Sequence, residues 1–439
     1  MAAQSSLISD FPARWLLYWI IVPNLTIILM WFVGGPPMVA GLTIFSLSTL
    51  VLAQLPWVWV KRVGLGGLIG YVSFLYVCNF FNFDAGEYDF LLPFLREVKP
   101  FRSLEYLMAG AVFLASAGFA IWKAPQVQRF ASPLSYGLAI LSIMGVLAAD
   151  YVSTKSTRGS YRSNAPAGAP FASAVDQAGI MSPDGQSHHL VVVIVEAMGV
   201  PTGKVGKALF AEDWNRPDWA SRYNVSRGEV PFYGSTTSGE LRELCGLWSD
   251  YGSVDQFGAD CLPARYARAG YQTSAMHGFS ETFFNREAWY PSIGFARMEF
   301  RESLAAAGVD YCNGVFTGTC DRQVPALIGE RLKQASAPQM VYFLTLNTHL
   351  PIVSTQRLGT ADCDLGPAGW AEENPQLCKL FILHRQLADA IDRLAMDPDL
   401  PATDFLIVGD HLPPFFDRKD RASFAPDRVP WVFLKAQGQ

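Results

Sequence analysis

Apolar residues are concentrated in the first third of this 439-residue chain, where they form five long stretches. Each stretch is close to the ~20 residues that an α-helix needs to cross the hydrocarbon core of a bilayer. They are residues 15–33, 38–60, 63–83, 104–122 and 136–152. Backbone groups inside a bilayer must find hydrogen-bond partners within the protein, which favours helices. We therefore expect a helical membrane domain of five spans over residues 1–152.

Basic residues between the apolar stretches predict the orientation of this domain. Arg14 precedes the first stretch, Lys61 and Arg62 separate the second from the third, and Lys123 and Arg129 separate the fourth from the fifth. The positive-inside rule places all of them in the cytoplasm, and everything after the fifth stretch outside it. The first stretch is too long for a cleaved signal peptide and lacks a small-residue cleavage site. These features predict a multi-pass membrane protein whose C-terminal part lies outside the cytoplasm.

The cysteines agree with that orientation. Cys78 is the only cysteine in the apolar third, whereas the other six all follow residue 240. An even set in a polar region indicates an oxidising compartment and up to three disulfides, although connectivity cannot be deduced from sequence. Free buried thiols in a cytosolic domain are the alternative. Pairing in sequence order would join Cys245 to Cys261, Cys312 to Cys320, and Cys363 to Cys378.

A second, water-exposed domain is expected after the membrane domain. Residues 153–188 are rich in Ser, Gly, Pro and Ala and predict a tether. In residues 189–439, short apolar strands alternate with helical segments, which indicates an α/β domain with a mostly parallel central sheet. The strand candidates are residues 190–195, 273–276, 340–346, 405–408 and 431–434.

The net charge of the whole chain is −5, which argues against nucleic acid as a partner.

The outer loop of residues 84–102 interleaves apolar and charged residues. This pattern is typical of an amphipathic segment that lies in the membrane interface, where it would help to hold a lipid substrate. A re-entrant stretch packed on the other spans fits the pattern equally well.

Acidic residues and histidines follow the predicted strands at their carboxyl ends. Glu196 ends the first strand, His277 the second and His349 the third, and Asp410 and His411 end the fourth. Ligand sites gather at this edge of a parallel sheet. Converging carboxylates and imidazoles predict a metal site with oxygen and nitrogen ligands.

Hydroxyl groups are clustered in the turn of residues 234–238, which precedes a helix-like segment carrying Glu240, Arg242 and Glu243. Such a cluster is most often a helix N-cap. The positive end of a helix dipole also favours an alkoxide or a phosphate at the same place.

Over residues 190–434, the chain resembles the membrane-anchored branch of the alkaline phosphatase superfamily. That branch includes lipoteichoic acid synthases, phosphoglycerol transferases and phosphoethanolamine transferases. The most specific stretch is residues 277–290, H-G-F-S-E-T-F-F-N-R-E-A-W-Y. The motifs that match in order are Glu196, Thr237-Ser238, His277-Gly278, Asn347 to His349, and Gly409-Asp410-His411.

The resemblance implies a multi-pass protein of a bacterial inner membrane, an alkaline phosphatase or sulfatase type of domain in the periplasm, and a role for each matched residue. The implied metal ligands are Glu196, Thr237, Asp410 and His411, with Thr237 also the nucleophile. The implied substrate-binding residues are His277, Arg286, His349, Asn347 and Phe284, which stands where the family has Trp. His349 would protonate the leaving alkoxide. Such ligands suit Zn or Mn, and Mg less well. The adjacent Thr236 remains a rival nucleophile.

One motif favours a different member of the superfamily. Cys261 and the four residues after it fit the C-x-P-x-R pattern in which sulfatases convert the cysteine to formylglycine. The turn that carries Thr237 already occupies the place of the nucleophile. We therefore expect Cys261 to be half of a disulfide at the start of a helix.

The expected function is transfer of a phosphoglycerol headgroup from phosphatidylglycerol to a hydroxyl of an envelope glycan or glycolipid, through a phospho-threonine intermediate. A phosphoethanolamine transferase that uses phosphatidylethanolamine is the first alternative. A membrane-anchored hydrolase, either a phosphodiesterase or a sulfatase, is the second. A scaffold protein that has lost its activity is disfavoured, because every type of ligand is present.

Overall fold

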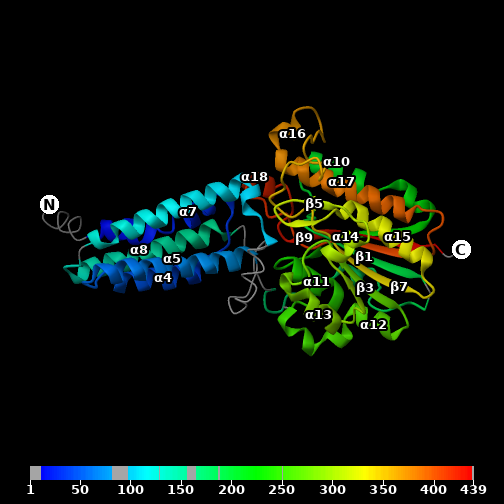
Figure 1. Ribbon diagram of the computed structural model, residues 1–439, viewed down its shortest axis with the longest axis horizontal. Coiled ribbons are helices and arrows are strands. Elements are labelled where there is room, and N and C mark those ends of the chain that lie inside the picture. Colours follow the sequence, from blue (N-terminus) through cyan, green and yellow to red (C-terminus); the bar gives the residue numbers. More distant parts are fainter. Residues whose placement is uncertain are drawn as a thin grey trace. The chain divides into compact units, whose positions relative to one another are not determined.

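The computed structural model describes residues 11–81, 97–127, 129–155, 165–185, 188–249 and 251–437, which fall into two compact units (Figure 1). The first unit combines residues 1–87 and 104–161. The second contains residues 88–103 and 162–439. Most of the predicted interfacial loop, residues 84–96, lies outside the described residues.

The first unit is helical throughout its described residues. Three of its helices are long and apolar enough to cross a membrane, and a fourth span results if a pair of helices bent by 69° counts as one. The bend falls at Pro23, which has no N–H to donate to a helix. The elements are α2 (Ala13–Trp15), a π-helical turn (Leu16–Ile21), α3 (Leu25–Val33), α4 (Val39–Leu52), α5 (Val58–Phe81), α7 (Leu104–Lys123) and α8 (Pro133–Ser153).

The second of the five expected spans is the one that differs most from its prediction. The helix α4 ends at Leu52 after 14 residues, and Val58 already belongs to α5. Pro56 lies between them, and the residue before a proline avoids the helical conformation. Apolar length alone therefore overestimated this helix, and a count of five spans stays a prediction.

A seven-stranded sheet organises the second unit, with the order β2-β9-β8-β1-β7-β3-β4. The five strands from β8 to β4 are parallel, whereas β9 pairs antiparallel with both β8 and the edge strand β2. The predicted mostly parallel α/β domain is therefore confirmed. The strands are β1 (His189–Val195), β2 (Tyr223–Pro231), β3 (Gln272–His277), β4 (Arg297–Glu299), β7 (Gln339–Leu344), β8 (Thr403–Gly409) and β9 (Arg428–Ala436).

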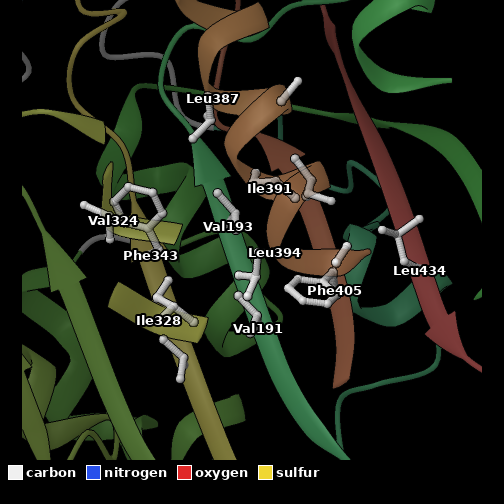
Figure 2. Packing of buried hydrophobic residues seen from close by; sticks show 14 of the residues in the cluster. Val191, Val193, Val324, Ile328, Phe343, Leu387, Ile391, Leu394, Phe405 and Leu434 are labelled. Atoms are coloured by element: carbon white, nitrogen blue, oxygen red, sulfur yellow. The ribbon is translucent and has the colours of Figure 1, made fainter. Parts of the chain in front are cut away.

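Helices cover both faces of this sheet (Figure 1). One face carries α10 (Lys204–Trp214), α15 (Val324–Gln334) and α17 (Pro375–Ala395), and the other carries α11 (Thr236–Cys245), α12 (Leu262–Arg268) and α13 (Arg286–Ser292). The helix α17 repeats apolar residues at helical spacing, which produces one apolar face. Figure 2 shows Leu387, Ile391 and Leu394 of this face packed over Val191 and Val193 of β1.

Part of the expected tether is folded onto the second unit. The short helix α9 (Ala174–Gln177) buries Ala174 and Val175, and the side chain of Ser173 caps it by accepting a hydrogen bond from Asp176 N. The segment from Ser173 to Gln177 is therefore folded, although it was predicted to belong to a tether.

The described end of the outer loop also belongs to the second unit. Val98 forms an antiparallel bridge with Phe316, and Lys99 N donates to Val315 O at 3.0 Å. Glu97 forms an ion pair with Arg301. These contacts lie beside the hairpin formed by β5 (Tyr311–Asn313) and β6 (Thr317–Thr319).

Replacement of a central core residue tests this packing. Phe405 of β8 is fully buried, and we expect Phe405→Ala to lower the free energy of unfolding by about 4 kcal/mol, through lost transfer energy and a cavity. Chemical unfolding of the full chain, followed by tryptophan fluorescence, measures the change. The control is Tyr311→Ala at an exposed position, which should change stability by less than about 1 kcal/mol. Equal losses would contradict the assignment of the core.

Candidate functional site

Two carboxylates and a histidine meet at the carboxyl ends of β1 and β8. Among the described residues, Glu196, Asp410 and His411 form the one cluster whose potential ligand atoms all lie within 4.8 Å of one another. His411 Nε2 is 3.4 Å from Glu196 Oε1 and 3.3 Å from Asp410 Oδ2. All three residues are buried. The structure thus brings together three of the four expected metal ligands.

The backbone fixes the orientation of Asp410. Its Oδ1 accepts hydrogen bonds from Ala197 N at 2.8 Å and from His411 N at 2.6 Å. Ala197 adopts a left-handed conformation, with φ of 55°, which is uncommon for a residue with a side chain. The other oxygen, Oδ2, is buried and has no hydrogen-bond partner. A buried, unpartnered carboxylate oxygen is costly unless a cation or a proton binds it.

The charges in this cluster depend on one another. Burial and the charge of Glu196 raise the pKa of Asp410 to about 8. Burial alone would lower the pKa of His411, but Asp410 and Glu196 raise it to about 10. Burial would also raise the pKa of Glu196, yet the charge of His411 lowers it. The cluster therefore attracts positive charge, and its oxygen and nitrogen donors fit a divalent ion such as Zn or Mn.

Thr236, rather than the expected Thr237, contacts this cluster. Its Oγ1 donates a hydrogen bond to Glu196 Oε2 at 2.9 Å and lies 3.3 Å from His411 Nε2. Both threonines begin helix α11, where Ser235 is the N-cap residue. Successive residues of a helix are rotated by ~100° from each other, so two adjacent hydroxyls cannot face the same site. The geometry therefore favours Thr236 over Thr237 as the nucleophile, an alternative that the sequence had left open.

Three histidines at the strand ends share one hydrogen-bonding pattern. The Nδ1 atoms of His277, His349 and His411 lie 3.0, 2.9 and 2.9 Å from the backbone oxygens of Leu344, Leu350 and Leu412, respectively. A carbonyl only accepts, so each Nδ1 carries a hydrogen and donates it, which leaves Nε2 as the functional nitrogen. Burial, reinforced by the charge of Arg286, lowers the pKa of His277 to about 3. Burial also lowers the pKa of His349.

Arg286 does not have the environment expected of a phosphate-binding arginine. It is buried, and its Nε and Nη2 donate to Glu240 Oε2 at 3.2 and 2.8 Å, while its Nη1 donates to Phe283 O at 3.2 Å. Glu240 also accepts hydrogen bonds from the hydroxyls of Tyr290 and Tyr342. A buried carboxylate needs a cationic partner, and Arg286 supplies it for Glu240. These contacts connect Arg286 to Glu240 within the protein, and its role in binding phosphate stays a prediction.

Phe284 and Asn347, both predicted to bind substrate, are also engaged within the protein. Phe284 is buried, and its ring centroid is 5.3 Å from Cζ of Arg286. Asn347 accepts a hydrogen bond from Asp321 N through Oδ1 and donates one to Thr319 O through Nδ2. Asn347 thus stabilises the turn that carries His349.

Asp321 is a supporting residue that the sequence did not reveal. Its Oδ2 accepts hydrogen bonds from Leu346 N at 2.8 Å and Asn347 N at 2.6 Å, in the turn before His349. Burial outweighs these hydrogen bonds and raises the pKa of Asp321 to about 7. In the sequence, an aspartate before a helix is indistinguishable from an ordinary N-cap.

The three disulfides are those expected from sequence order. Cys245 is bonded to Cys261, Cys312 to Cys320, and Cys363 to Cys378. Cys261 therefore has no free thiol for conversion to formylglycine, and the expectation of a disulfide at the start of α12 is confirmed.

Comparison with protein families agrees with this site. Residues 232–433 match the family model described as Sulfatase. The matched segment covers less than half of the chain. It contains Thr236, His277, His349, Asp410 and His411, whereas Glu196 precedes it. No curated protein matches the chain.

The solved structures to which the chain is similar include three transferases or synthases. One is the lipoteichoic acid synthase LtaP from Listeria monocytogenes, at 14% identity and a TM-score of 0.45, over 59% of this chain and 68% of that one. Another is the Streptococcus pyogenes phosphoglycerol transferase GacH in complex with sn-glycerol-1-phosphate, at 17% identity and a TM-score of 0.39, over 58% of this chain and 71% of that one. A third is the integral membrane lipooligosaccharide phosphoethanolamine transferase A from Neisseria meningitidis, at 13% identity and a TM-score of 0.39, over 98% of this chain and 76% of that one.

The state of Cys261 gives a test of the sulfatase motif. We expect mass spectrometry of the non-reduced, digested protein to recover Cys261 linked to Cys245, with no formylglycine. Removal of the pair by Cys245→Ser and Cys261→Ser should lower stability by about 3 kcal/mol, since the disulfide closes a loop with a sequence separation of 16. The pair Cys363 and Cys378, with a separation of 15, is the matched control. Formylglycine at position 261 would contradict the assignment.

The raised pKa of Asp321 predicts a pH dependence of stability. Between the ordinary value of 3.8 and about 7, the folded chain retains a proton that the unfolded chain has released. Stability from this group is therefore lost as the pH rises through that window. Asn has no such proton, so Asp321→Asn should gain stability relative to the native chain between about pH 4 and pH 7, as measured by urea unfolding. The exposed Asp255→Asn should show no such trend, and a flat difference for Asp321→Asn would refute the prediction.

Proposed function

We propose that this protein is a membrane-anchored phosphotransferase whose sulfatase-family domain faces the periplasm. It would transfer a phosphoglycerol headgroup from a phospholipid to a hydroxyl of an envelope glycan or glycolipid. The observation that carries the proposal is the position of Thr236, whose hydroxyl hydrogen-bonds to Glu196 and lies beside His411. The apolar helices of the first unit support a lipid donor, because they would keep the site near the membrane.

In the first step, Thr236 is the nucleophile. A threonine hydroxyl is too weak an acid to react unaided, and a divalent ion held by Glu196, Asp410, His411 and Thr236 would supply the charge that lowers its pKa. The Thr236 oxygen attacks the phosphorus of the phosphodiester while its proton passes to Glu196. The bond from phosphorus to the diacylglycerol oxygen breaks, that oxygen takes up a proton from the protonated form of His349, and diacylglycerol leaves. Thr236 then carries the headgroup as a phosphodiester.

In the second step, an acceptor hydroxyl replaces Thr236 on the phosphorus. His349 is suited to receive the acceptor proton, because its Nδ1–H is held by Leu350 O and its lowered pKa leaves Nε2 with a free lone pair. The acceptor oxygen forms a bond to phosphorus, the bond to Thr236 breaks, and Thr236 takes back the proton that Glu196 received in the first step. In the first step, His349 can protonate the leaving diacylglycerol only after it has itself been protonated.

The donor is assigned from the sequence. The motif at Glu196 and residues 277–290 resemble those of phosphoglycerol transferases, and they favour phosphatidylglycerol as the donor. The three disulfides are more typical of phosphoethanolamine transferases that use phosphatidylethanolamine. A phosphodiesterase with water as the acceptor would use the same residues. A sulfatase is disfavoured, because Cys261 is in a disulfide.

Isosteric substitutions of the two threonines test the nucleophile. We expect Thr236→Val to lower headgroup transfer by at least about a thousandfold, because the attacking oxygen is lost. Thr237→Val should retain transfer within about tenfold, because Thr236 is the threonine whose hydroxyl hydrogen-bonds to Glu196. The assay uses purified full-length protein and vesicles that contain phosphatidylglycerol or phosphatidylethanolamine. The reverse pattern would return the role to Thr237.

The same incubation distinguishes the donors and the alternatives. Mass spectrometry of digested protein should find a phosphoglycerol adduct on Thr236 after incubation with phosphatidylglycerol, and none after chelation of the metal. A phosphoethanolamine adduct would assign the other donor. Free glycerol phosphate, with no modified acceptor when glycolipid is present, would identify a hydrolase.

A further inference from the structure

Helix α11 carries three charged residues that are fully buried. Glu240, Arg242 and Glu243 are each 0% exposed, on a helix of 10 residues that begins with Thr236. Charged side chains are almost never fully buried unless they are paired. Glu240 binds Arg286, as described above, whereas Arg242 and Glu243 connect the helix to the metal cluster and to α9.

Arg242 holds the backbone at the end of β8. Its Nη2 donates to Gly409 O at 2.6 Å, and its Nη1 donates to Asp410 O at 3.1 Å. A guanidinium is a rigid, planar fork, so one side chain can bind two neighbouring acceptors at once. These carbonyls belong to the segment that carries Asp410 and His411. Arg242 thus restrains the backbone from which two of the candidate ligands project.

A glycine permits the same helix to approach Asp410 closely. A Cβ atom at Gly239 would lie 3.0 Å from Cβ and 3.1 Å from Cα of Asp410. Both distances are shorter than ordinary van der Waals contact between carbon atoms. The close approach at Gly239 and the hydrogen bonds from Arg242 therefore act on one backbone segment, less than one helical turn apart.

Glu243 fixes the guanidinium from its other side. Its Oε1 accepts from Arg242 Nε at 2.5 Å, and its Oε2 accepts from Val175 N at 3.0 Å in α9. The carboxylate balances the buried charge of Arg242 and orients the fork toward the carbonyls. A continuous set of hydrogen bonds thus runs from α9, through the charged pair, to Asp410.

We propose that Arg242, oriented by Glu243, is a positioning residue for the metal site. It sets the distance between Thr236 on α11 and Asp410 and His411 after β8, so that the ligand atoms are preorganised for one divalent ion. A lysine cannot replace it, because a single ammonium group cannot bind both carbonyls and Glu243 in the same plane. The inference rests on the proposed metal site, but it does not require that the reaction be headgroup transfer.

The test measures metal affinity in the full-length protein, separately from transfer activity. Mn²⁺ and Zn²⁺ are titrated into chelator-treated protein, and their dissociation constants are obtained by calorimetry or by competition with a chelating dye. We expect Arg242→Lys to weaken binding by about tenfold or more, a typical effect of losing a residue that orients the ligands. Arg242→Ala should be weaker still, and millimolar guanidinium should restore part of its affinity. A purely structural role would not produce that rescue.

Matched variants keep the outcome decisive. Arg216 also donates to a backbone oxygen and pairs with carboxylates, those of Asp389 and Asp392, away from the cluster. Arg216→Lys should leave the affinity unchanged. If Arg242→Lys does not fold, Glu243→Gln is titrated in its place. We expect this variant to bind the metal several-fold more weakly than the native chain. Native affinity in either folded variant would overturn the proposal. A native chain that binds metal without transferring a headgroup would instead refute the proposed function.

Discussion

The candidate site depends on two carboxylates that face each other in a buried position. Glu196 and Asp410 follow adjacent parallel strands, so the sheet itself brings them together. Their charges repel, and Asp410 Oδ2 accepts no hydrogen bond although His411 Nε2 lies 3.3 Å from it. Such a pair is stable only with positive charge nearby. His411 supplies part of that charge, and the remaining deficit is what makes the cluster suitable for a divalent ion.

The surrounding structure maintains this arrangement through polar contacts that do not themselves perform chemistry. Backbone N–H groups hold one oxygen of Asp410, backbone carbonyls fix the tautomers of three histidines, and Asp321 holds the turn before His349. The buried charges of α11 add a second layer. Glu240 engages Arg286, and Arg242 restrains the carbonyls of Gly409 and Asp410. A site of this kind is rigid before any substrate arrives, which is the condition for electrostatic catalysis.

Much of the architecture could be predicted because it follows from local patterns. The parallel sheet was recognisable from short apolar runs between helical segments, and a histidine or a carboxylate after a run marked a strand end. Disulfide pairing followed sequence order because each pair closes a short loop. Prediction of the spans was less accurate, since apolar length does not register the break at Pro56 that ends α4 after 14 residues.

The sequence alone determined the apolar helical region, the type of domain, and the set of side chains at the strand ends, because composition and periodicity encode these directly. Only the tertiary structure showed that Thr236 contacts Glu196 and His411, since the rotation of a helix about its axis is fixed by packing and not by adjacent hydroxyls. It also decided the partner of Arg286. An arginine satisfies a buried glutamate as well as it satisfies a phosphate, and Glu240 is recognised as that glutamate only once the folded chain has buried it beside Arg286.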